Sequence, residues 1–397
     1  MTQREASPVR LELAGFCLVF VGLGLARFGY PPLIPVMVAH GTLTPAGAGY
    51  MAAANFAGYL AGALAADPSA RRLGPRPVML AALVAAVASF VACGVDLGLG
   101  WLGFWRCVAG ISGGLLMVMV PPVLLPLIPV ALRPRAGGRL FAAVGAGMLV
   151  SGLLLPLMPQ AGPGTLWLLI ALLGAVAGIA GFALLPRALG ATAAAADRRE
   201  SVAAAGEAPR FGRAFWGLGV LYAAIAMSYI PHTVFWVDFL ARDRGAGLGA
   251  GGAAWMLFGL GALLGPQALG RLAGRFGYAP TLRASSLGLV AALLLPIGVD
   301  SETLLSATSV LAGACAIGSV SLVSGRSNAI VAPERRARAW AILTVGFAVM
   351  QGAGAWLLSV VLSVTHSYTA LFVTAAGVLL AGLLADALLG RDARAAR

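Results

Sequence analysis

Charged side chains are scarce in this sequence, and lysine is missing altogether. Only 10% of the 397 residues are charged, whereas soluble domains carry roughly 25%. Hydrophobic residues make up 60% of the chain, and the mean hydropathy is +0.92. A soluble domain of this composition would expose far too much apolar surface. The composition therefore indicates an integral membrane protein with several spans, and the lipid bilayer is its first expected partner.

The missing lysine excludes a nucleotide-binding loop of the G-x-x-x-x-G-K-[ST] type, so any ATP-driven process would need a separate subunit. The segment GLGAGG (247–252) fits G-x-G-x-x-G, but no strand precedes it and the dinucleotide interpretation fails. The formal net charge of +13 comes from 27 arginines. They fall in short clusters between apolar runs, which favours membrane topology over a nucleic-acid partner.

Cysteine and histidine are also few, with four and three residues respectively. None of the cysteines forms a C-x-x-C pair, and all lie within apolar runs. We interpret them as small buried hydrophobes rather than metal ligands or disulfides. No nucleophile–base pair or metal-ligand cluster is visible, so we expect no enzyme, no cofactor and no metal.

Twelve apolar runs are long enough to cross a bilayer, which takes about 20 residues per helix. The expected fold class is therefore an all-α membrane protein with twelve transmembrane helices. The expected spans are 12–38, 46–66, 77–95, 98–120, 139–159, 165–186, 214–240, 249–270, 281–299, 303–325, 338–363 and 368–389.

The arginines predict the orientation of these spans. With the N-terminus in the cytoplasm, 22 of the 27 arginines lie on the inner side and only Arg242 and Arg244 lie outside. This positive-inside bias predicts a multi-pass membrane protein with both termini in the cytoplasm. The longest polar stretch, 187–213, reads as a cytoplasmic linker between an N-terminal half (1–186) and a C-terminal half (214–397).

The two halves repeat each other at an offset of 203 residues. The matching glycines and arginines lie in the second and eighth spans and in the loops that follow, which indicates an internal duplication. The pairs are Gly49 and Gly252, Gly58 and Gly261, Gly62 and Gly265, Arg72 and Arg275, and Gly74 and Gly277.

Several short motifs resemble those of the major facilitator superfamily. The loops RRLGPRP and GRFGYAP resemble its inner loop, although the acidic residue usual there is missing from the second copy, and FWRCVAGISGG (104–114) resembles its helix-four motif. GLARFGYPPLIPVM, SYIPHTVFWVDFLAR and GFAVMQGAGAW resemble the YbfB/YjiJ group of bacterial transporters. The resemblance implies two six-helix pseudo-repeats, a substrate site near the midplane between them, and alternating access.

Arg27 lies about fifteen residues into the first span, where a charge costs about 2.5–3.5 kcal/mol on insertion scales. Pro31 and Pro32 cannot donate the helical bonds to the carbonyls of Arg27 and Phe28, so the helix should be interrupted there. We interpret Arg27 as a cavity residue that binds an anionic group of the substrate, since guanidinium grips a carboxylate bidentately. The alternative is a structural arginine bonded to carbonyls or to a neighbouring helix.

Three further residues are candidates for substrate binding or coupling. By resemblance, Arg106 in the helix-four motif belongs near the substrate or the proton pathway; the alternative is pairing with backbone or with a residue of span one. His232 lies midway along span seven, and its reference pKa near 6.5 suits proton coupling, although a satisfied structural histidine is the alternative. Asp238, further along, is a second candidate for proton coupling or an outer gate residue.

Charged residues near the expected inner ends have simpler interpretations. We expect Glu12 and Asp386 to be solvated, and Arg326 to snorkel to the interface or serve as a gate residue. Other residues at cavity depth complete the expected substrate site: Tyr30, Asn55, Tyr59, Trp236 and Gln351.

The sequence thus predicts a secondary transporter, working as a monomer, for a small organic solute that is anionic or carries a carboxylate. Protons are the expected coupling ion if His232 or Asp238 titrates; facilitated diffusion and exchange stay open. The alternatives are a multidrug or metabolite exporter, or a membrane sensor that binds a ligand without moving it.

Overall fold

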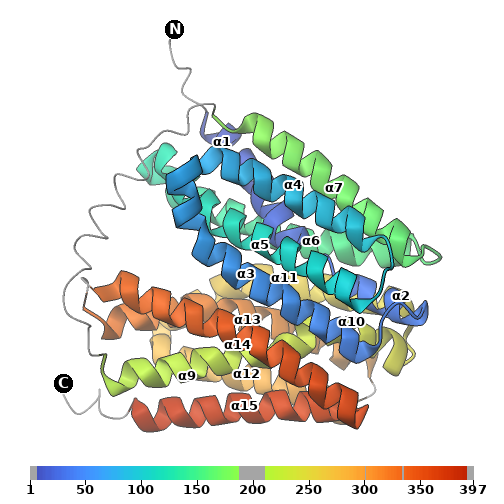
Figure 1. Cartoon of the computed structure of the whole chain (residues 1–397). Coiled ribbons are helices and arrows are strands. Elements are labelled where there is room, and N and C mark those ends of the chain that lie inside the picture. The colour runs from blue at the N-terminus through green and yellow to red at the C-terminus, as the bar shows by residue number, and fades with distance from the viewer. Residues whose placement is uncertain (1–6, 187–210, 300, 333–334, 391–397) are drawn as a thin grey trace. The chain divides into compact units, whose positions relative to one another are not determined.

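The structure is a computed structural model, and it describes residues 7–186, 211–299, 301–332 and 335–390 (Figure 1). Within those ranges the side chains of residues 134, 135, 302 and 337 are not described. Regular structure in the described part is helical throughout. Most of the expected linker at 187–213 lies outside the described residues, as do both chain ends that we placed in the cytoplasm.

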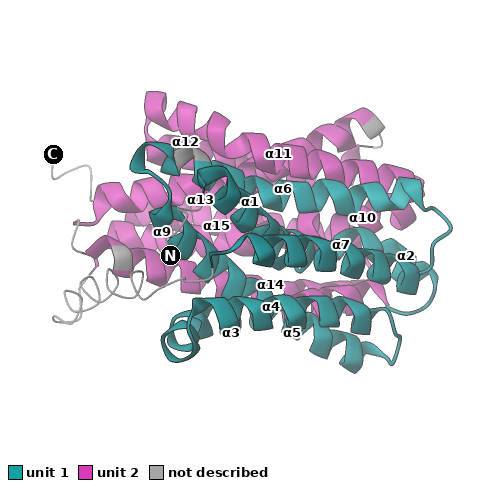
Figure 2. Cartoon of the chain, turned by 90° about the horizontal axis from the view of Figure 1, so that it is seen from above, with its two compact units in different colours: residues 1–43, 54–200 teal, residues 44–53, 201–397 magenta. Residues whose placement is uncertain are grey.

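The chain forms two compact units (Figure 2). Unit 1 contains residues 1–43 and 54–200, and unit 2 contains residues 44–53 and 201–397. The helix α3 (Pro45–Leu73) begins in unit 2 and runs into unit 1. The other α-helices of unit 1 are α1 (Pro8–Val19), α2 (Ile34–Ala39), α4 (Pro75–Cys93), α5 (Leu99–Leu124), α6 (Arg133–Leu157) and α7 (Pro163–Leu184). Those of unit 2 are α9 (Arg213–Ser228), α10 (Trp236–Asp238), α11 (Gly247–Phe276), α12 (Tyr278–Gly298), α13 (Glu302–Ile330), α14 (Arg336–Thr365) and α15 (Tyr368–Leu389).

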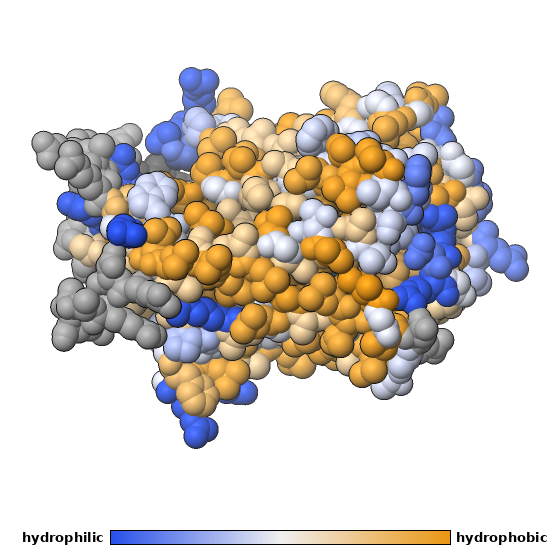
Figure 3. Space-filling view, turned by 90° about the horizontal axis from the view of Figure 1, so that it is seen from below, coloured by the Kyte–Doolittle hydropathy of each residue, from blue (hydrophilic) through white to orange (hydrophobic). Residues whose placement is uncertain are grey.

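Eleven helical segments in the described part are long and apolar enough to cross a membrane, and they occupy eleven of the twelve expected spans. The remaining expected span is α3, whose length of 29 residues is sufficient. Its glycines, two tyrosines and Asn55 lower its hydropathy below that of the other spans. Hydrophobic side chains cover most of the face seen in Figure 3, and hydrophilic side chains gather toward the helix ends, as a lipid-embedded surface requires.

The first span of each half is interrupted, and in unit 1 the interruption falls where Pro31 and Pro32 predicted it. In unit 1, α1 continues into a π-helix, η1 (Phe20–Leu25), then a turn and a short 3₁₀-helix, η2 (Pro31–Leu33), before α2. In unit 2, α9 is followed by two π-helices, η5 (Pro231–Phe235) and η6 (Phe239–Asp243), on either side of α10. Proline removes a backbone donor, and wide π turns absorb the irregularity.

Glycines bring the backbones of two helix pairs into direct contact. A Cβ atom added to Gly58 on α3 would lie 2.1 Å from the carbonyl oxygen of Cys107 on α5. One added to Gly261 on α11 would lie 2.1 Å from the carbonyl oxygen of Val310 on α13. Both the glycines and their partners are 203 residues apart. The repeat read from the sequence is therefore present in the helix packing of each unit.

The expectation that Glu12 is solvated is wrong. Glu12 on α1 is only 7% exposed, and its Oε2 atom lies 2.5 Å from Nη1 of Arg139 on α6. Arg139 itself remains exposed. The carboxylate is thus buried against a cation from another helix, which lowers the cost of removing it from water.

Asp386 and Arg326 are also buried rather than solvated or snorkelling. Asp386 on α15 is 0% exposed and accepts a 2.9 Å hydrogen bond from Nε of Arg283 on α12. Nη1 of Arg326 on α13 lies 2.7 Å from Oδ1 of Asp386 as an ion pair, without the angles of a hydrogen bond. Three helices of unit 2 therefore meet at one buried carboxylate held by two guanidinium groups.

Candidate functional site

Arg27 lies in the interruption between η1 and η2, with its guanidinium over three aromatic rings. Its Cζ atom is 4.7 Å from the ring centre of Phe56, 5.2 Å from that of Phe28 and 5.5 Å from that of Tyr59. Phe56 and Tyr59 lie one turn apart on α3, so one helix face supplies two of the rings. The negative faces of these rings attract the cation. Arg27 is half-buried, in contrast to the full burial of Arg106.

The backbone carbonyls near this interruption have side-chain partners. Oγ of Ser151 on α6 donates a 3.2 Å hydrogen bond to the carbonyl oxygen of Phe28, which Pro32 cannot reach with a helical bond. Nδ2 of Asn55 donates to the carbonyl oxygen of Ala26 at 3.2 Å. The expected interruption is confirmed, and neighbouring helices donate to the carbonyls of Phe28 and Ala26.

Asn55 connects the two arginine-bearing segments. The same Nδ2 atom that donates to Ala26 donates a 2.9 Å hydrogen bond to the carbonyl oxygen of Arg106 on α5. Asn55 is buried on α3, so its amide holds the main chain beside Arg27 and the main chain of Arg106 at once. In this conformation it acts on the backbone; its predicted contact with substrate stays a prediction.

Arg106 is the most deeply buried arginine of the described residues, at 1% exposure. Its Cζ atom lies 4.7 Å from the ring centre of Tyr30 and 5.7 Å from that of Trp167 on α7, and these two rings stack on each other. Among the described residues no atom accepts a hydrogen bond from Nε or Nη1 of Arg106, and no acidic side chain forms an ion pair with it. A buried cation without a counter-charge is costly in a membrane.

In unit 2 the structure places His232 among aromatic rings. His232 is 0% exposed, and its ring centre lies 4.7 Å from that of Trp236 and 5.9 Å from that of Phe372 on α15. Neither ring nitrogen has a hydrogen-bond partner among the described residues. Nε1 of Trp236 donates a 2.8 Å hydrogen bond to Oγ of Ser309 on α13. Two predicted site residues, His232 and Trp236, are therefore in direct contact.

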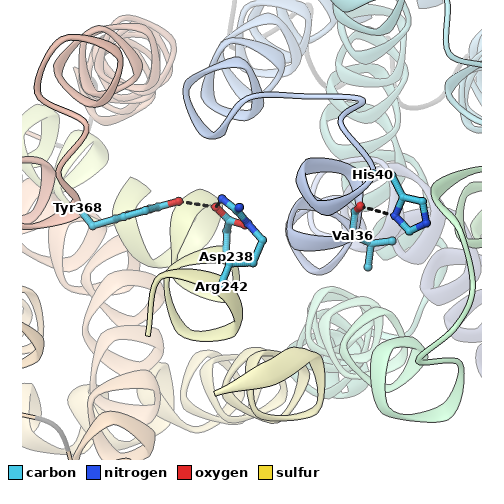
Figure 4. A network of polar contacts seen from close by, with 5 residues as sticks. All are labelled: Val36, His40, Asp238, Arg242 and Tyr368. Carbon is cyan, nitrogen blue, oxygen red and sulfur yellow. Dashed lines mark hydrogen bonds and ion pairs between the residues drawn. The ribbon is translucent and has the colours of Figure 1, made fainter. Parts of the chain in front are cut away.

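Gln351 and Asp238 both have partners within unit 2. Nε2 of Gln351 on α14 donates a hydrogen bond to the hydroxyl oxygen of Tyr229, just before η5. Asp238 is fully buried and is bound by Nε and Nη2 of Arg242, one turn further on. The hydroxyl of Tyr368 at the start of α15 donates to the same carboxylate (Figure 4). Asp238 thus links the interrupted helix of unit 2 to α15.

The predicted site residues fall into two groups. Arg27, Tyr30, Asn55, Tyr59 and Arg106 come together in unit 1, whereas the other four lie in unit 2. The sequence did not predict four further residues that contact this set. An aromatic residue or a serine within a span does not show by itself which residues it will contact. These four are Phe56, Ser151, Trp167 and Tyr368.

Solved structures share this fold. A bacterial homologue of the human lysosomal transporter Spinster, in an inward-facing and occupied conformation, matches with a TM-score of 0.73 and 17% identity over 98% of both chains. A D-xylose–proton symporter matches with a TM-score of 0.66 and 16% identity, over 95% of this chain and 96% of that one. The human organic anion transporter TETRAN matches with a TM-score of 0.61 and 19% identity, over 94% and 99%.

These likenesses confirm the expected fold class, the twelve-helix fold of the major facilitator superfamily. A family model described as "uncharacterised MFS-type transporter YbfB" matches residues 19–386, and the chain belongs to that family. The resemblance read from the motifs in spans one, seven and eleven is therefore confirmed. No curated protein sequence matches the chain significantly. The protein is a multi-pass membrane protein of a transporter family.

Proposed function

We propose that this protein is a secondary transporter for a small organic anion, or for a solute with a carboxylate, that works by alternating access. The substrate's carboxylate binds Arg27 and Arg106, and the rings and amides around them form the remaining walls. The two halves, 1–186 and 214–397, joined by the linker 187–213, are the moving parts. The protein resides in a bacterial inner membrane, with both termini in the cytoplasm, and works as a monomer.

The observation that carries this proposal is the Arg27 guanidinium held over three ring faces inside a membrane-spanning segment. Cation–π contacts hold the charge through the flat face of the group, whereas carboxylates bind along its N–H edge. A helix interruption beside such a charge is a common way to build a transporter site. The half-buried position of Arg27 supports access for a solute.

A thermal-unfolding panel on the purified protein in detergent tests the substrate class. Small carboxylates, sugars, amino acids and lipophilic cations are compared, because a ligand of the folded state raises its stability by about 2.7 kcal/mol at 100 times its Kd. We expect carboxylates to raise the unfolding midpoint, and Arg27→Gln to abolish that rise. Arg71→Gln, an exposed arginine of unit 1, is the matched control and should respond as the native protein does.

Two results would contradict the proposal. Unchanged carboxylate binding and transport in Arg27→Gln, with only a loss of stability in Arg27→Ala, would make Arg27 structural. Stabilisation by lipophilic cations in place of carboxylates would favour the exporter alternative. A protein that binds a solute but moves none into reconstituted vesicles would instead be a sensor.

We further propose that His232 couples transport to protons, with Asp238 as the second candidate. The burial of His232 between Trp236 and Phe372, with neither nitrogen bonded among the described residues, supports a group whose partner changes during transport. Transport into vesicles is measured with and without a pH gradient. We expect transport to depend on the pH gradient and this dependence to disappear in His232→Asn. If transport is the same with and without the gradient, and the same in His232→Asn, then His232 does not couple transport to protons.

A further inference from the structure

The interior of unit 1 contains a group of hydrogen-bond donors with no acceptor. Nε and Nη1 of Arg106 and Nε1 of Trp167 are buried, and among the described residues none of the three has a hydrogen-bond partner. The Trp167 ring centre lies 5.7 Å from Cζ of Arg106, so the three nitrogen atoms belong to two side chains in contact. Buried polar groups are normally bonded, and each exception calls for an explanation.

None of the described residues around Arg106 supplies a negative charge. Tyr30 lies over the guanidinium, and the Cys93 thiol on α4 is the other titratable group close enough to interact with it electrostatically. The Asn55 amide donates only to carbonyl oxygens. Guanidinium keeps its charge in proteins, and a buried charge must be paired. The missing partner is therefore an acceptor that also carries a negative charge; water would satisfy the donors but not the charge.

The space around Arg106 limits the size of that partner. The backbones of α3 and α5 touch one turn further along, where a Cβ atom on Gly110 would lie 2.1 Å from the carbonyl oxygen of Asn55. The stacked rings of Tyr30 and Trp167 also lie against the guanidinium, and Arg106 is almost completely enclosed. A single, almost completely enclosed positive charge with unpaired donors suits a small monovalent anion.

We propose that Arg106 and Trp167 form a binding site for a halide-sized monovalent anion, which neutralises Arg106 whenever no substrate carboxylate is bound to it. The site goes beyond the proposed function, because Arg106 needs a counter-charge whether or not the chain transports a carboxylate. If it does, the carboxylate displaces the ion, and halide competes with substrate.

The experiment measures the unfolding midpoint of the purified full-length protein in detergent as chloride, bromide or iodide replaces methanesulfonate at constant ionic strength. No carboxylate is present in the buffer. We expect a saturable rise of the midpoint with halide, because an ion bound only by the folded state stabilises it. The response should disappear in Arg106→Gln and persist in Arg71→Gln, an exposed arginine of the same unit.

A second variant keeps the test decisive if Arg106→Gln does not fold. Trp167→Phe retains an aromatic ring but removes the N–H donor, and should weaken halide binding about tenfold, the effect of one lost hydrogen bond to a charged partner. Equal midpoints in halide and methanesulfonate, or a full response in Trp167→Phe, would overturn the proposal. So would a response kept in Arg106→Gln, which would be a general salt effect.

The outcome is separate from that of the carboxylate panel. Stabilisation by carboxylates without any halide response would leave the proposed function in place and remove the halide site. A halide response that depends on Arg106, in a protein that no carboxylate stabilises, would support the halide site and contradict the proposed carboxylate substrate.

Discussion

The side-chain amide of Asn55 donates a 2.9 Å hydrogen bond to the main-chain carbonyl of Arg106. Its second bond, to the carbonyl of Ala26, holds the residue that precedes Arg27. One neutral side chain on α3 therefore fixes the backbone beside both intramembrane arginines of unit 1. The position of each charge depends on this amide as well as on its own helix.

Asn55→Ala should lower the free energy of unfolding by about 1–3 kcal/mol, because two buried carbonyls lose their donor. Affinity for the substrate or for an anion should fall as well, since both arginines lose their backbone support. Thermal unfolding in detergent measures the first effect and ligand titration the second. Asn328→Ala, at an exposed position on α13, is the control and should change stability by less than about 0.5 kcal/mol. A native-like midpoint for Asn55→Ala would show that the two bonds contribute little.

Asp386→Asn should be among the most destabilising single changes in unit 2. It leaves Arg326, which is buried, and Arg283 without their carboxylate, and breaking a buried ion pair costs about 3–5 kcal/mol. The yield of monodisperse protein and the unfolding midpoint should both fall.

The control is Asp67→Asn, which removes an exposed ion pair with Arg71 and should cost about 1 kcal/mol or less. Replacing Asp386 and Arg326 together by leucine and methionine should restore much of the loss, because the buried Arg326 charge is removed and the remaining Arg283 is about one-third exposed to solvent. If the double variant is no better than Asp386→Asn, the pairing argument fails.

Gly58→Ala and Gly261→Ala should be damaging to similar degrees. In each, the new methyl group would overlap a carbonyl oxygen of the partner helix at 2.1 Å, and only movement of a backbone can relieve this. Overpacking of this kind costs about 1–3 kcal/mol, and more when backbone must move. The unfolding midpoint measures both. Gly103→Ala and Gly270→Ala, with open space around the added atom, are the matched controls. A clear loss in only one of the two variants would contradict the equivalence of the two helix pairs.

Tyr368→Phe should destabilise the protein by about 1.5–3 kcal/mol, the range for a hydrogen bond to a charged group. Arg242 still binds Asp238 in this variant, so the loss should be smaller than that of Asp238→Asn. A double-mutant cycle of the two changes should show coupling, because they share one contact. Tyr278→Phe, at an exposed tyrosine, serves as control. Additive losses would mean that the hydroxyl and the carboxylate act independently.

Much of the fold could be predicted because the bilayer constrains it so strongly. Runs of about 20 apolar residues predict the spans, and the offset of 203 between matching glycines predicts the repeated helix packing. The interruption near Arg27 was equally accessible, since proline removes a defined hydrogen bond. The partner of the freed Phe28 carbonyl could not be predicted, because Ser151 lies 123 residues away in the sequence. Any other hydroxyl in a span would have been an equally good candidate.

Pairing between distant charges was the weakest part of the prediction. Glu12 and Asp386 looked solvated because each lies near a helix end, and helix ends usually reach the interface. Their actual partners come from other helices, 127 and 103 residues away in the cases of Arg139 and Arg283. Burial of a carboxylate depends on where those arginines arrive in three dimensions, which hydropathy along the chain does not encode.

The glycine contacts between α3 and α5, and between α11 and α13, have a mechanical consequence. Where two backbones touch, no side chain lies between them that could change rotamer and let one helix slide past the other. Each helix pair should therefore move as one rigid body during any conformational change. The bending that transport requires must come from segments with irregular hydrogen bonding. The π and 3₁₀ turns after α1, and the π turns after α9, are the places where a bend costs least.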